Sequence, residues 1–146
     1  MPSAGETIIA GRIPGERIAT NIETSDSGSI STTETVVMSV TAPVVEGRTY
    51  RVKAVFNVDG TVSNDTFVAR LREDSVSGAQ LQVDRVDLTN PSTNLAAVPL
   101  EVEYTADATE DKTFVLCFIR STGTGSMILA AAGNAPSYLY VDYIRG

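Results

Sequence analysis

Hydrophobic and polar residues alternate along most of the chain with a period of two, which is the pattern of β-strands that bury one face. The clearest example is segment 50–58, and the same alternation recurs at 66–72 and 100–105. Further strands are predicted at 35–42, 79–88, 112–121, 125–132 and 137–145. These segments are rich in Val, Thr, Tyr, Phe and Ile and are bounded by Gly, Pro, Asn, Asp or Ser, as strands commonly are.

Segment 113–119 departs from simple alternation because it is apolar on both faces after its first residue. Such a strand is buried from both sides, either at the centre of a sandwich or between the core and another subunit. The central position is the simpler interpretation, and it makes Cys117 a small buried hydrophobe without chemistry of its own.

The connections between these segments are short and polar. Asp59-Gly60 predicts a tight turn, residues 121–126 a flexible hairpin loop, and residues 89–94 a longer loop rich in turn-forming residues. No segment shows sustained helical periodicity. Eight or so short strands at regular spacing predict an all-β protein, an antiparallel β-sandwich of jelly-roll-like topology.

The first thirty residues differ from the rest, because Ile8, Ile9 and Ile13 stand among Gly and Pro and are followed by a polar stretch. We therefore divide the chain into an N-terminal arm at 1–30 and a sandwich domain at 31–146. One hypothesis is an extended arm that packs on a neighbour, with Ile8, Ile9, Ile13 and Ile18 as its anchors. The alternative, of comparable weight, is an edge strand and loop of the domain itself.

The net charge of the chain limits the classes of partner that we expect it to bind. The 146 residues, the length of one domain, include 11 Lys and Arg against 18 Asp and Glu, a net charge of -7. Nucleic acids and anionic membranes are bound through clustered basic residues, which this sequence lacks. Neither is an expected partner. No leader-like pattern and no apolar run of about 20 residues is present, so neither secretion nor a membrane span is expected.

The candidate chemistry is sparse. The chain contains no histidine and one cysteine, so it has no histidine-based triad, no cysteine zinc site and no internal disulfide. Glu101 and Glu103 share the polar face of one strand, and three further acids lie at 107–111. A glycosidase pair and a calcium loop are both disfavoured, because these acids look solvated and the calcium-loop spacing is missing. We predict no enzyme activity, no cofactor and no metal.

Tyrosines mark the last predicted strand. Tyr138 and Tyr140 share one of its faces, and Tyr143 lies on the other face with Leu139 and Val141. Tyrosines on a strand can stack on sugars, but they are also common at subunit interfaces. Because the chain has no tryptophan, we favour a role in trimer contacts or in the core.

Five motifs resemble small virion proteins of bacteriophages that infect actinobacteria. They are IPGERIA at 13–19, TETVV at 33–37, GRTYRV at 47–52, FVARLRED at 67–74 and PSYLYVDYI at 136–144. The resemblance spans nearly the whole chain, and its motifs are structural rather than catalytic.

The resemblance implies a jelly-roll structural protein on the outer surface of the phage particle. The expected function is capsid decoration, in which a homotrimer binds the major capsid protein or another virion protein and cements the shell. The alternative is a minor tail or fibre component that binds a carbohydrate or host receptor through loops such as 89–94 and 121–126. A hydrolase built on acidic pairs is the least favoured hypothesis.

Overall fold

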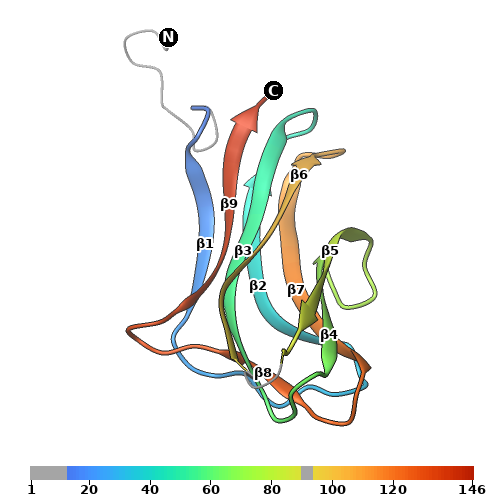
Figure 1. Ribbon diagram of the computed structural model, residues 1–146. Helices are drawn as coiled ribbons and strands as arrows, with labels where there is room; N and C mark the ends of the chain where they lie inside the picture. Colours follow the sequence, from blue (N-terminus) through green and yellow to red (C-terminus); the bar gives the residue numbers. More distant parts are fainter. Residues whose placement is uncertain (1–12, 90–93) are drawn as a thin grey trace, which may run out of the picture.

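The computed structural model describes residues 13–89 and 94–146, which form two antiparallel β-sheets packed face to face (Figure 1). The prediction of an all-β antiparallel sandwich is confirmed. In the described residues the strands are β1 (Arg17–Glu23), β2 (Thr35–Val44), β3 (Thr49–Gly60), β4 (Thr66–Glu73), β5 (Gln80–Asp87), β6 (Asn94–Thr105), β7 (Glu110–Thr122), β8 (Met127–Ala130) and β9 (Ser137–Arg145).

The strands divide between two sheets. Sheet A has the order β1-β9-β3-β6, with the short β8 paired to the end of β3 beyond β9. Sheet B has the order β2-β7-β4-β5. The chain therefore passes from one sheet to the other at most of its connections, and most hydrogen-bonded neighbours are distant in sequence.

The core lies between the sheets and is filled by alternate side chains of each strand. The face of β3 that was predicted from its alternation is buried, from Tyr50 through Phe56 to Val58. Aromatic rings meet across the two layers, with centroids 5.2 Å apart for Phe56 and Phe118 and 5.1 Å apart for Tyr104 and Phe114. Offset and edge-on ring pairs of this kind add to the stabilisation that burial provides.

The central strand β7 is buried on both faces, which explains its continuous apolar run. Phe114, Leu116 and Phe118 point into the core, whereas Val115 and Cys117 belong to the outer face of sheet B. Arg70 and Arg72 are the cross-strand neighbours of Cys117 and Val115 on β4. The two predicted alternatives are thereby resolved, because β7 is a central strand that this chain itself covers.

The arginines on that outer face are held by one carboxylate. Glu34 Oε1 lies 2.5 Å from Arg70 Nη1, and Glu34 Oε2 lies 3.0 Å from Arg72 Nη2. The extended arginine stems can then shield the apolar side chains beneath them while their charged ends remain paired.

Side-chain amides join the two sheets at both open sides of the sandwich. Asn21 on β1 donates from Nδ2 to the backbone oxygen of Ser39 on β2, at 2.9 Å. Gln82 on β5 donates from Nε2 to the backbone oxygen of Glu101 on β6, at 3.3 Å. Each bond occupies a carbonyl of an edge strand that would otherwise be open to another chain.

The N-terminal segment is in part an edge strand of the domain. β1 pairs with β9, Ile18 and Ala19 pack against the core, and Ile30 is buried. For residues 17–23 the edge-strand alternative is therefore the correct one, and the sandwich includes residues before the expected boundary at 31. The predicted anchors Ile8 and Ile9 lie outside the described residues.

Two connections differ from their predicted form. Asp59 and Gly60 are the last residues of β3, so the tight turn predicted there lies one step later, at 61–64, and leads to β4 of the other sheet. Residues 123–126 likewise join β7 of sheet B to β8 of sheet A, so they are not a hairpin loop. Local sequence predicts a reversal of direction but does not reveal in which sheet the next strand pairs.

We expect Phe118→Ala to lower the free energy of unfolding by about 3–5 kcal/mol, because it removes a fully buried ring that meets Phe56 across the core. Urea unfolding followed by circular dichroism measures the change. Val83→Ala is the control, since Val83 is 43% exposed on an outer face, and its effect should stay within about 0.5 kcal/mol. Equal effects of the two variants would contradict this account of the core.

Candidate functional site

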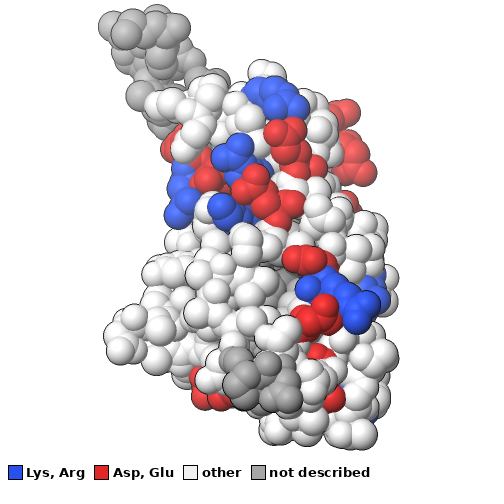
Figure 2. Space-filling model, in the orientation of Figure 1, with Lys and Arg blue, Asp and Glu red and all other residues white. Residues whose placement is uncertain are grey.

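The outer face of sheet A has three zones that follow one another along β3. Its outward side chains, in chain order, are Arg51, Lys53, Val55, Asn57 and Asp59. The same face appears in space-filling form in Figure 2, where basic and acidic residues gather over the upper part and a large uncharged area lies below them. The zones are a charged network, an apolar row and a cavity.

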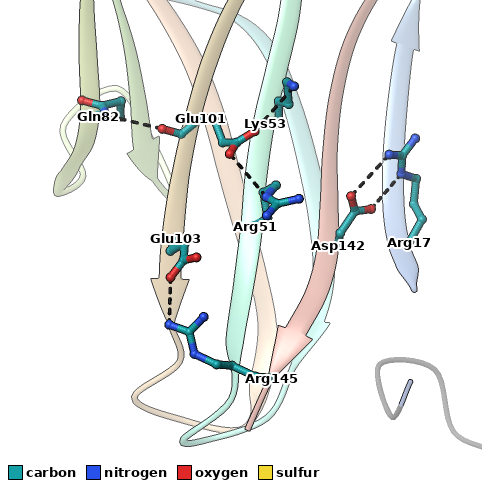
Figure 3. A network of polar contacts seen from close by, with 8 residues as sticks. All are labelled: Arg17, Arg51, Lys53, Gln82, Glu101, Glu103, Asp142 and Arg145. Carbon is teal, nitrogen blue, oxygen red and sulfur yellow. Dashed lines mark hydrogen bonds and ion pairs between the residues drawn. The ribbon is translucent and has the colours of Figure 1, made fainter. Parts of the chain in front are cut away.

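The charged network covers the end of the sheet near the C-terminus (Figure 3). Glu101 lies between two cations, with its carboxylate oxygens 3.3 Å from Arg51 Nε and 3.5 Å from Lys53 Nζ. Glu103 pairs with Arg145 at 2.9 Å. These contacts place Glu101 and Glu103 in surface ion pairs on the polar face of β6.

Arg17 closes the network at the β1 edge. Its Nε lies 2.9 Å from Asp142 Oδ1, and its guanidinium carbon stands 3.6 Å from the centre of the Tyr140 ring. The hydrogen bond to Asp142 raises the pKa of Arg17 above its ordinary value. Tyr140 is therefore engaged by a residue of its own chain.

The apolar row crosses the sheet beside this network. Register aligns Ile22 of β1 with Tyr138 of β9, Tyr138 with Val55 of β3, and Val55 with Pro99 of β6. Ile22 is 49% exposed, Pro99 is exposed, and the other two are half-buried. The row is a continuous uncharged strip four strands wide.

A cavity of about 340 Å³ opens on the same side of the sheet, at the end of β3. Its apolar lining comes from Val58, Leu95, Ala96, Ala130, Ala131, Ala132 and Ala135. Its polar lining comes from Asp26, Asn57, Asp59 and Asn94. Neither carboxylate forms an ion pair with a described residue, and no Lys or Arg is among the described residues that line the cavity.

Asn57 holds the wall of the cavity together. Its Oδ1 accepts a hydrogen bond from the backbone of Ala97 at 3.0 Å, and its Nδ2 donates to the backbone oxygen of Ala135 at 3.0 Å. The backbone of Ala97 has a φ of +53°, which is uncommon for a residue with a Cβ atom. One amide side chain therefore links β6, β3 and the segment before β9, and fixes the cavity walls.

The residues that the sequence singled out are placed in different environments. Tyr138 and Tyr140 share one face of β9, as predicted, and that face is the outer one. Tyr143 is buried, and its ring centroid is 5.8 Å from that of Tyr50. Ile13 is 54% exposed, and Ile18 packs partly against the core. Tyr143 is thus a core residue, and Tyr138 is the tyrosine that belongs to the apolar row.

A second charged group lies at the end of sheet B. Lys112 Nζ is 3.1 Å from Glu73, 3.0 Å from Asp74 and 3.5 Å from Glu110. Burial alone would lower the pKa of this ammonium, but its hydrogen bonds to Asp74 and Glu73 outweigh that effect and raise it. Lys112 therefore stays protonated and holds the acidic side chains together rather than acting as a nucleophile.

No group of three or more His, Cys, Asp or Glu side chains arranged to hold a metal ion occurs within residues 13–89 and 94–146. In that part of the chain there is also no helix of the length and apolarity that crossing a membrane requires.

The glycine-rich connection after β7 is tied down rather than loose. The carboxylate of Asp65, which is 4% exposed, accepts hydrogen bonds from the backbone of Gly125 at 2.6 Å and of Thr124 at 3.3 Å. Arg120 donates to the backbone oxygen of Gly125. The other loop weighed for sugar binding, 89–94, lies largely outside the described residues.

Comparison with known proteins leaves the family open. No protein-family model matches the chain. A search of well-characterised proteins finds no significant match.

Removing the Asp65 carboxylate should destabilise the fold. We expect Asp65→Ala to lower the free energy of unfolding by about 1–3 kcal/mol, because it leaves buried backbone N–H groups unpaired. Gly123→Ala should act on the same contact, since its Cβ atom would lie 1.8 Å from Asp65 Oδ1 and its φ is +103°. Urea unfolding measures both, with the exposed Asp111→Ala as control. A change for Asp65→Ala no larger than that of the control would count against the contact.

Cys117 should be inert in the folded protein. Burial raises its pKa to about 11, and its side chain is fully covered, whereas the reactive form of a cysteine is the exposed thiolate. A chromogenic disulfide reagent should react with Cys117 only after unfolding in urea. Rapid labelling of the native protein at neutral pH would show that the outer face of sheet B opens.

Proposed function

We propose that the protein is a structural protein of a bacteriophage virion that decorates the capsid and cements its outer surface. The observation that favours this function most is the apolar row Ile22–Tyr138–Val55–Pro99, an uncharged strip that crosses the outer face of sheet A. Such a strip is suited to burial against another protein surface.

The fold supports the same proposal. The sheet orders β1-β9-β3-β6 and β2-β7-β4-β5, with repeated crossing between the layers, favour the jelly-roll topology that the motif resemblance implies. A rigid two-layer block with joined edges can act as a spacer between neighbouring shell subunits. In this proposal the block assembles as a homotrimer, so that linked weak contacts add up to firm attachment.

Burial at the apolar row should be necessary for attachment. The test uses phage particles that lack the wild-type protein. We expect the double variant Ile22→Ser, Tyr138→Ser to co-sediment with these particles about tenfold less or weaker still, because the contact loses two apolar side chains. Val83→Ser on the outer face of sheet B is the matched control, and circular dichroism checks that all variants fold.

The N-terminal hypothesis is tested separately by truncation. Deletion of residues 1–12 is preferred to a cut at residue 20, because a cut at 20 removes Arg17–Thr20 from the pairing of β1 with β9. If both the truncated protein and the double variant load like wild type, capsid decoration through these surfaces is wrong. A particle copy number of only a few molecules would instead support the tail or fibre alternative.

A further inference from the structure

We propose that the cavity between the start of β6 and β8 is a receptor for a basic side chain, a lysine or arginine, of a partner protein. The inference rests on the proposed function, because it names the chemistry of the surface that the outer face of sheet A contacts. The cavity is lined by two carboxylates, those of Asp26 and Asp59, and neither forms an ion pair with a described residue.

The position of Asp59 is the first argument. Asp59 is paired in register with Ile128 of β8 on one side and with Asn94 of β6 on the other, so it stands between both walls of the cavity. Its neighbour Val58 is buried in the core, and side chains alternate along a strand, so the Asp59 carboxylate points outward. No described residue donates a hydrogen bond to it.

Asp26 supplies a second carboxylate from the segment after β1. One of its oxygens, Oδ1, accepts a hydrogen bond from the backbone of Ala131 at 2.9 Å, which fixes the carboxylate at the rim. Its other oxygen is bonded to no described residue. Both acids face the same cavity, so a cation between them would gain from two negative charges.

The contrast with the other end of the sheet strengthens the assignment. Glu101, Glu103 and Asp142 are each paired with Arg or Lys of this chain, whereas Asp26 and Asp59 form no ion pair within residues 13–89 and 94–146. The negative charge left over on this face is therefore concentrated at the cavity, in a protein of net charge -7. Complementary charge on a partner would orient it and fix its register.

The apolar lining fits the stem of a basic side chain. Lysine and arginine carry aliphatic chains that pack on apolar surface while the charged end reaches polar groups. The alanine methyl groups and Leu95 provide that surface, and the carboxylates lie beside it. A sugar ring fits less well, because no aromatic side chain is among the described residues that line the cavity.

The cavity and the apolar row belong to one surface. Val55 and Asp59 are four residues apart on the same face of β3, a separation of about 13 Å along a strand. A partner that covers the apolar row can therefore insert a basic side chain into the cavity without any change in this chain.

Nuclear magnetic resonance titration of the full-length, isotope-labelled protein tests the assignment without any phage particle. Lysine blocked at both ends is the probe, and norleucine blocked in the same way is the matched neutral probe with the same aliphatic stem. We expect the lysine probe to shift backbone resonances around Asp59, Leu95 and Ala131 and the norleucine probe to shift them much less. Asp59→Asn should weaken binding of the lysine probe about fivefold, as expected when a partly exposed ion pair is lost.

Control variants and a second ligand make the outcome decisive. Asp111→Asn removes an exposed carboxylate elsewhere and should leave binding unchanged, whereas Asp26→Asn should weaken it. Equal shifts with both blocked amino acids, or binding of N-acetylglucosamine in preference to lysine, would overturn the inference. If the cavity does not bind the lysine probe but the protein still binds phage particles, this inference alone is wrong. If the cavity binds the lysine probe but the protein does not bind phage particles, the proposed function is wrong.

Discussion

The packing of β3 against β7 is the interaction on which the rest of the molecule depends. Each strand occupies the middle of its sheet, and their inward residues meet at Phe56 and Phe118. The burial of these side chains holds the sheets at a fixed separation, so that the outward residues of β3 are presented in fixed order. The amides of Asn21 and Gln82 secure the same separation at the two open sides.

The outer faces of sheet A and sheet B differ in how far they are covered by side chains of this chain. Sheet B uses its outer face to protect β7, where Glu34 and two arginines lie over Cys117 and Val115. Sheet A leaves part of its outer face uncovered, and there the paired charges give way to the apolar row and then to the acidic cavity. In the function proposed above, this sequence of zones along β3 is the surface that contacts another protein.

Much of the fold could be predicted because a strand that buries one face has alternating apolar and polar residues in its sequence. The alternation at 50–58 and 66–72 identified the buried faces of β3 and β4, and the doubly apolar run at 113–119 identified a central strand. β1 was harder, because the Pro and Gly before it and its mixed burial hide the alternation. The hairpin loop predicted at 121–126 was wrong for a related reason, since a reversal looks the same whether the next strand joins the same sheet or the opposite one.

By itself the sequence determined that this chain is built of strands, which face of its clearest strands is buried, and that it offers no histidine. It could do so because periodicity and composition can be read without knowing which strands pair. Only the tertiary structure decided which strands are partners, that Tyr143 is in the core while Tyr138 is outside, and that Asp26 and Asp59 share a cavity with Ala130. Residues so far apart in the chain are brought together only by the pairing of distant strands. Burial of apolar surface selects that pairing for the molecule as a whole.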